Sequence, residues 1–250
     1  MKSFGDESPA RPLGRSHAGS VDARTSTGLS AVVGNERMTA LAGAVLLVLI
    51  VVELATSASL RTLLPIHIFV GVLLAGPLAV KLGSTGYRFV RYYTRSPAFV
   101  RRGPPHPALR LLAPLLVVTM LVVIGSGIGL VVTGPQSAVP FRQLHSVSVL
   151  LLLPLLAIHV FAHIRGVPRL VADDWSKPSG GQAPGRGRRL GMNLGALMLG
   201  ALAAILLFPV AAPWLAWSTT NGKNGPSSPL IAGILLATLA VLAARPLKWK

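Results

Sequence analysis

Long apolar stretches alternate with short polar ones along most of the chain, and this pattern predicts membrane-spanning helices. Each stretch is close to the ~20 residues that a helix needs to cross a bilayer. We expect six spans, of which the last is the shortest: 38–58, 63–82, 110–132, 143–164, 190–212 and 229–244. The predicted fold class is therefore all-α, a polytopic transmembrane bundle of about six helices.

The polar segments divide the chain into four parts. Residues 1–37 are rich in Gly, Ser, Pro and Arg and are expected to form a disordered tail. A four-helix membrane domain is expected at 38–166, followed by a flexible linker at 167–189 that contains "SKPSGGQAPGRGRR". Residues 190–250 complete the chain as a pair of transmembrane helices with a short tail.

The composition supports a membrane protein and excludes several kinds of chemistry. Of the 250 residues, 52% are hydrophobic and only 12% are charged, whereas soluble domains have roughly 25% charged residues. The chain has no cysteine, which excludes disulfides, thiolate-held iron–sulfur clusters and thiol nucleophiles. Redox chemistry would therefore need a bound cofactor.

The net charge of +17 is distributed very unevenly about the predicted spans. With the N-terminal tail on one side, that side holds 21 of the 24 Lys and Arg residues, and the other side holds Arg61, Arg142 and Lys223. The positive-inside rule then predicts a multi-pass protein of the plasma (inner) membrane with both termini in the cytoplasm. Topology thus accounts for the charge, and no nucleic-acid partner is expected because no nucleic-acid-binding fold accompanies it.

Three histidines lie on one face of the fourth predicted span. Fourteen residues of helix advance ~21 Å and return to within about 40° of the starting direction, so His145 and His159 face the same way in opposite leaflets. His163 shares that face because eighteen residues make five full turns. Ionisable side chains inside a membrane are functional-site candidates by default.

The second predicted span carries His67 near its outer end and Lys81 fourteen residues later. A b-type haem needs two axial ligands at one depth on facing helices, and neutral imidazole is a standard one. His67 and His145 meet that requirement, which predicts a haem site near the outer face. His159 lies deeper, where the matching residue is Lys81, so a second haem would need an unusual ligand.

The paired histidines on one helix and the stretch "SGIGLVVTGP…FRQLHSVSVLLLLPLLAIHVFAH" resemble helices 3 and 4 of the four-helix di-haem cytochrome b family of quinone-linked bacterial oxidoreductases. The resemblance covers about residues 38–166. It implies haem b held by His67, His145 and His159, with Lys81 where the family has a fourth histidine. It also implies a quinone in the bilayer and an oxidoreductase subunit at the outer face as redox partners.

Each of these residues also has a plainer interpretation. The histidines, His163 included, fit equally well as hydrogen-bonded links between helices, and Lys81 fits a side chain that reaches the inner headgroups. Arg61 and Arg142 lie where they could neutralise haem propionates or simply anchor the outer interface. Glu53 suits a proton relay or an ion pair with Arg61.

Two classes of function follow. The first is an electron-transfer membrane cytochrome, acting as an oxidoreductase subunit rather than as a stand-alone enzyme, in which iron carries the redox chemistry. The alternative is a haem-free anchoring or assembly subunit, or a small transporter. A haem-handling or haem-sensing protein is a third possibility, and no soluble catalytic constellation is recognised.

Overall fold

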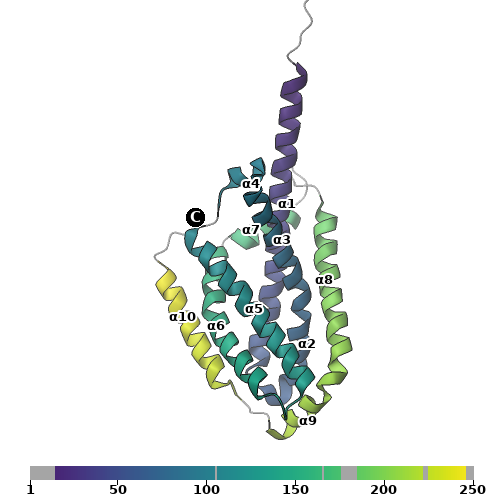
Figure 1. Cartoon of the computed structure of the whole chain (residues 1–250), viewed down its shortest axis with the longest axis vertical. Helices are drawn as coiled ribbons and strands as arrows, with labels where there is room; N and C mark the ends of the chain where they lie inside the picture. The colour runs from purple at the N-terminus through teal and green to yellow at the C-terminus, as the bar shows by residue number, and fades with distance from the viewer. Residues whose placement is uncertain (1–14, 105, 165, 176–184, 222–224, 246–250) are drawn as a thin grey trace, which may run out of the picture.

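The computed structural model describes residues 15–104, 106–164, 166–175, 185–221 and 225–245, and all regular structure within them is helical (Figure 1). The predicted all-α helical bundle is thereby confirmed. The helices are α1 (Arg15–Thr56), α2 (Leu60–Leu73), α3 (Ala75–Tyr93), α4 (Pro97–Arg102), α5 (Pro107–Thr133), α6 (Val139–His163), α7 (Gly166–Trp175), α8 (Arg186–Leu207), the 3-10 helix η1 (Phe208–Ala211), α9 (Ala212–Asn221) and α10 (Ser228–Ala244).

Five helical segments are long and apolar enough to cross a membrane: Gly28–Thr56, Leu60–Tyr93, Pro107–Thr133, Val139–His163 and Arg186–Asn221. The sixth predicted span is α10, a shorter apolar helix. Large apolar side chains such as Leu111, Leu199 and Leu206 are exposed on the outside of these helices. Such a surface is suited to lipid, and the chain has the features of a multi-pass membrane protein.

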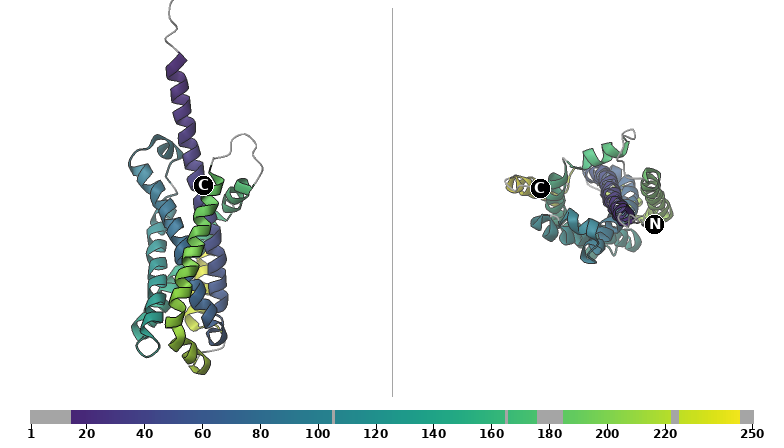
Figure 2. Two further views of the ribbon diagram at one scale, coloured as in Figure 1. Left: turned by 90° about the vertical axis from the view of Figure 1, so that its right-hand side faces the viewer. Right: turned by 90° about the horizontal axis from the view of Figure 1, so that it is seen from above.

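The long helices run up and down side by side (Figures 1 and 2). We call the end where α3 finishes and α5 begins the upper end, and the end where α1 finishes and α2 begins the lower end, as in Figure 1. α10 packs against α6 and α8 packs against α2 and α3, so the last two spans lie at opposite edges of the bundle (Figure 2).

The N-terminal region differs from the sequence prediction. Residues 15–37, expected to be part of a disordered tail, belong to α1; residues 1–14 lie outside the described part of the chain. The later part of this segment has a tertiary partner, because α4 folds back beside α1 and Val32 packs with Ala98 and Phe99. The first turns of α1 extend beyond the rest of the bundle (Figure 1). Composition alone could not reveal that these residues have an apolar partner.

The connection after α6 also contains structure. α7 occupies part of the expected linker and packs against α1, and α8 begins at Arg186 rather than at 190. The fifth span bends near Pro209 into η1 and then α9. α9 is tied to α5 because the Trp214 indole donates to the backbone oxygen of Leu130 over 2.6 Å.

The second span is longer than predicted and is interrupted at Leu74. Pro77 has no N–H to donate to the carbonyl of Leu73, four residues earlier, so the α-helical ladder is broken there. The helix nevertheless continues in nearly the same direction, since Leu74 keeps right-handed helical dihedrals. Pro77 itself is fully buried.

At this interruption α8 approaches α2 and α3 unusually closely. A Cβ on Gly76 would lie 2.0 Å from the backbone oxygen of Ala196, and a Cβ on Gly200 would lie 2.5 Å from that of Leu73. Ala196, Gly200 and Ala204 form a buried stripe of small residues at intervals of four on α8. This is the small-xxx-small pattern by which membrane helices bring their backbones together.

Away from this contact, the helices meet through large side chains. A buried cluster joins Leu46 and Ile50 of α1, Leu78 of α3, Met120 of α5 and Leu152 of α6. α5 packs extensively against α6 and α1 packs against α3, while a smaller contact joins α2 to α5. This cluster therefore links the two helix groups through side chains.

Gly200 offers a direct test of the α8 contact. Replacing Gly200 with Val should lower the stability of the bundle by about 1–3 kcal/mol or more, because overpacking forces the helices apart. Thermal unfolding in detergent would measure the change. Gly195→Val in the same helix is the matched control, since nothing lies within 4 Å of a Cβ there; equal losses for the two variants would contradict the close contact.

Candidate functional site

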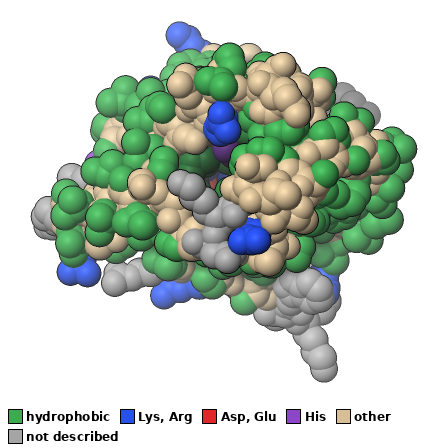
Figure 3. All heavy atoms as spheres, turned by 90° about the horizontal axis from the view of Figure 1, so that it is seen from below, with side chains coloured by type: hydrophobic (Ala, Val, Ile, Leu, Met, Phe, Trp, Pro, Cys, Tyr) green, Lys and Arg blue, Asp and Glu red, His purple; other side chains and the backbone are tan. Residues whose placement is uncertain are grey.

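His67 of α2 and His145 of α6 meet near the lower end of the bundle. Their ring centroids are 6.4 Å apart and the ring planes are nearly perpendicular, at 88°. Seen from below, the molecular surface has a central recess in which a histidine side chain is visible (Figure 3). The structure thus brings together the two imidazoles that the sequence placed at one depth on different helices.

The separation of these rings suits a shared metal ion. Metal–nitrogen bonds of histidine are about 2 Å long, so two imidazoles bound to one ion have centroids roughly 6 Å apart. The observed 6.4 Å agrees with that requirement. Among the described helices, α2 and α6 have little or no close backbone packing, so the two histidines meet through their side chains.

Two polar atoms of α5 contact the His145 ring. Its Nδ1 lies 3.0 Å from the backbone oxygen of Val123 and 3.1 Å from Oγ of Ser126. A carbonyl can only accept, so Nδ1 must carry the hydrogen of the neutral ring. Ser126 is buried and donates to the carbonyl oxygen of Val122 over 2.6 Å.

His67 is held in the same way by α1, but its partner is acidic. Nδ1 lies 2.5 Å from Oε2 of Glu53, with Oγ1 of Thr56 at 3.2 Å and Oγ of Ser57 at 3.5 Å. The Glu53 and His67 side chains are only 13% and 23% exposed. The other carboxylate oxygen, Oε1, is buried and has no hydrogen-bond partner within the described part of the chain.

These contacts fix which nitrogen of each ring is available. Both imidazoles use Nδ1 to donate, one to a carbonyl and one to a carboxylate, so each neutral ring carries its lone pair on Nε2. A metal-ligating histidine almost always donates its other N–H to a carboxylate or a backbone carbonyl. Nε2 of His67 and Nε2 of His145 are therefore the ring nitrogens that have the electronic character of a metal ligand.

Glu53 contacts His67, which differs from the ion pair with Arg61 that the sequence also suggested. Arg61 begins the first turn of α2 and Arg142 lies in the first turn of α6, and both side chains are exposed at the lower end. Their positions remain compatible with either interface anchoring or neutralisation of propionates.

The glycine-rich segment of α5 serves His145 and its neighbours. A Cβ on Gly127 would come within 3.4 Å of Cε1 of His145, and one on Gly129 would lie 2.5 Å from the ring of Phe141. Gly125, by contrast, has nothing within 4 Å of a Cβ. Gly127 and Gly129 therefore let side chains of α6 pack against the α5 backbone.

The inner histidines do not form an equivalent site. The ring of His159 contacts the ring of His163 in the same helix, with 4.7 Å between their centroids. Lys81 donates from Nζ to the backbone oxygen of Thr39 over 2.9 Å, which ties α3 to α1. Among the described side chains no facing pair of imidazoles is formed at this level, so the residues do not fit a second bis-histidine haem.

No group of three or more His, Cys, Asp and Glu side chains suited to a metal ion occurs in the described residues. A haem iron needs only two protein ligands, because the porphyrin supplies the rest. Comparison of the chain with protein-family models, curated proteins and solved structures finds no match. Any function must therefore be inferred from the residues of this chain.

The Glu53–His67 contact should be measurable as a coupling energy. His67→Leu leaves a buried carboxyl without its partner and should cost about 1–3 kcal/mol of stability, whereas the Glu53→Leu/His67→Leu double variant should cost less than the sum of the two single changes. Thermal unfolding of protein prepared without haem provides the measurement. A parallel cycle of Thr133→Ala with His67→Leu should show little coupling, because the Thr133 hydroxyl bonds to carbonyls of its own helix; strict additivity for Glu53 and His67 would argue against the contact.

Proposed function

We propose that this chain is a membrane cytochrome that binds one b-type haem between His67 and His145 and passes electrons between quinone and a redox partner. The observation that supports it is the 6.4 Å separation of two imidazoles whose Nδ1 atoms are both bound to acceptors on neighbouring helices. A haem bound there would supply one-electron chemistry at its iron.

The contribution of the protein is to hold, orient and shield the two ligand rings. α1 fixes His67 through Glu53, and α5 fixes His145 through Val123. Apolar side chains of the cluster that includes Leu46, Met120 and Leu152 fill the bundle between this level and the upper histidines. Burial of this kind excludes water and helps to set the reduction potential of a bound haem.

The proposed orientation places the lower end at the outer face of the plasma membrane and both termini in the cytoplasm. It rests on the excess of Lys and Arg on the upper side of the bundle. An oxidoreductase subunit would then exchange electrons at the outer face, and Arg61 and Arg142 would lie beside the haem propionates. No step is assigned to His159, His163 or Lys81, because their arrangement does not supply a second pair of ligands.

A visible absorbance spectrum tests the proposal directly. Purified protein supplied with haem should show the sharp α and β bands of a six-coordinate b-type cytochrome after reduction with dithionite. His67→Ala and His145→Ala should each abolish these bands, because each removes one axial ligand.

His159→Ala is the control for this experiment. It removes an imidazole of similar burial from the same helix as His145, and the bands should remain. A haem-replete preparation without such bands would exclude the proposal and favour a haem-free anchoring subunit or a transporter.

The carboxylate beside His67 should tune the potential of the bound haem. A negative charge hydrogen-bonded to a ligand imidazole favours the oxidised, more positive iron, so Glu53→Gln should shift the midpoint potential to a more positive value while an amide oxygen still accepts from Nδ1. Potentiometric titration of the α band gives the readout. Ser126→Ala, which alters a neutral contact to His145, should shift the potential less; a larger shift in Ser126→Ala would refute this role of Glu53.

A further inference from the structure

The upper end of α3 and the short helix α4 form a basic and aromatic surface that the proposed electron transfer does not use. We call residues 87–102 the α3–α4 platform; it contains five arginines and no acidic residue. The arginines are Arg88, Arg91, Arg95, Arg101 and Arg102. A concentration of one sign of charge at one end of a membrane bundle points to a partner of the opposite sign.

The platform lies where the helix leaves the hydrocarbon. The continuous span Leu60–Tyr93 has 34 residues, which corresponds to about 51 Å of helix, whereas the hydrocarbon core is about 30 Å thick. With the apolar part of this span in the hydrocarbon, the upper turns of α3 would extend into the headgroup layer, and their arginines would lie at the depth of lipid phosphates.

Apolar and aromatic side chains are exposed among these arginines. Tyr87, Phe89 and Tyr93 are 46%, 62% and 56% exposed, and Val90 and Val100 are exposed as well. Such a mixture suits the interface, where aromatic rings sit at headgroup level and arginines meet phosphates.

The platform is held rigidly against the bundle. Phe99 is buried and packs with Ala98 and Val32 of α1, its ring lies 5.7 Å from that of Tyr87, and the Arg91 guanidinium lies over it at 5.8 Å. An arrangement fixed in advance loses less entropy when a ligand binds.

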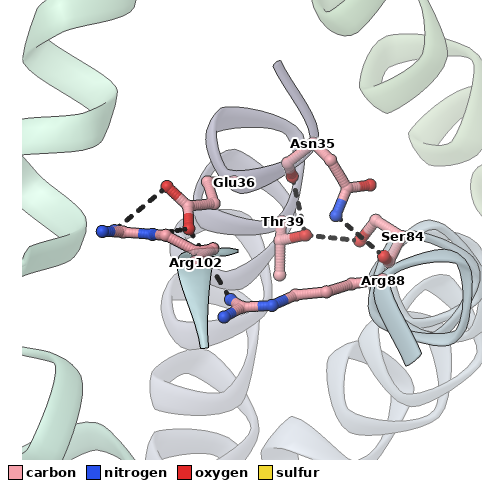
Figure 4. Close-up of polar contacts among 6 residues, drawn as sticks. All are labelled: Asn35, Glu36, Thr39, Ser84, Arg88 and Arg102. Atoms are coloured by element: carbon pink, nitrogen blue, oxygen red, sulfur yellow. Dashed lines mark hydrogen bonds and ion pairs between the residues drawn. The ribbon is translucent and has the colours of Figure 1, made fainter. Parts of the chain in front are cut away.

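One carboxylate organises part of this surface. Glu36 of α1 accepts from Nε and NH2 of Arg102 at 2.8 and 3.3 Å and lies 3.7 Å from Arg88 (Figure 4). The hydrogen bond from Arg102 and the charge of Glu36 raise the pKa of Arg102. Thr39, one turn further along α1, bonds through its hydroxyl to Oγ of Ser84 over 2.8 Å, which fastens α1 to α3 beside the ion pairs.

Glu36 neutralises only a fraction of the positive charge. Within the part of the chain that the structure describes, no carboxylate pairs with Arg91, Arg95 or Arg101, and the side chains of all three are exposed. Among the residues that the structure describes, the guanidinium groups of Arg95 and Arg101 have no ion-pair or hydrogen-bond partner and can meet a ligand.

We propose that the α3–α4 platform binds the phosphate headgroups of anionic phospholipids, selectively over zwitterionic lipids. The aromatic and apolar side chains would enter the upper part of the acyl layer while the arginines bind the headgroups. This inference does not depend on haem binding.

Lipid binding to the full-length protein in detergent tests the proposal. Native mass spectrometry would count bound phosphatidylglycerol and phosphatidylcholine with matched acyl chains over a titration of each lipid. Wild type should bind phosphatidylglycerol preferentially, and Arg95→Gln/Arg101→Gln should weaken that binding by roughly tenfold or more while leaving phosphatidylcholine binding unchanged.

Arg61→Gln/Arg142→Gln is the matched control, because it removes the same charge from two exposed arginines at the lower end. It should leave the preference for phosphatidylglycerol intact. The proposal is overturned if wild type binds both lipids equally, if the upper double variant binds phosphatidylglycerol as wild type does, or if the lower double variant loses as much. Unchanged thermal unfolding of the variants in detergent would show that any loss is not caused by misfolding.

Discussion

An imidazole N–H in hydrocarbon has no water to donate to, so the protein itself must provide the acceptor. His67 finds its acceptor on α1 and His145 on α5, each in the helix that precedes its own. Two helical hairpins are thereby closed by a hydrogen bond near the same end. The rings then meet between the hairpins, each with its remaining nitrogen unused by these contacts.

Helix spacing in the bundle follows the sizes of the residues at each contact. Gly76 and Gly200 let α3 and α8 touch backbone to backbone, whereas leucines and a methionine separate α1–α2–α3 from α5–α6. α8 thus packs against α2 and α3, whereas His67 of α2 points toward His145 of α6.

Sequence periodicity and composition predicted the fold class, the approximate spans and the juxtaposition of His67 with His145, because hydropathy and helical rise are local properties. The acceptor of His67 was not identified: the depth of Glu53 matched that of His67, but a carboxyl can pair with any cation in reach. The packing of Val32 against Ala98 and Phe99 depends on α4 folding back beside α1, and the close approach of α8 depends on which face of α8 meets Gly76. These are tertiary contacts, which local sequence patterns do not predict.

The missing N–H of Pro77 has a consequence for biogenesis. The Leu73 carbonyl that it leaves without a helical partner is covered by the backbone of Gly200, which is made 123 residues later than Pro77. The close contact at Gly76 and Gly200 can therefore form only after the fifth span has been synthesised, so the packing of the second span is completed late in the synthesis of the chain.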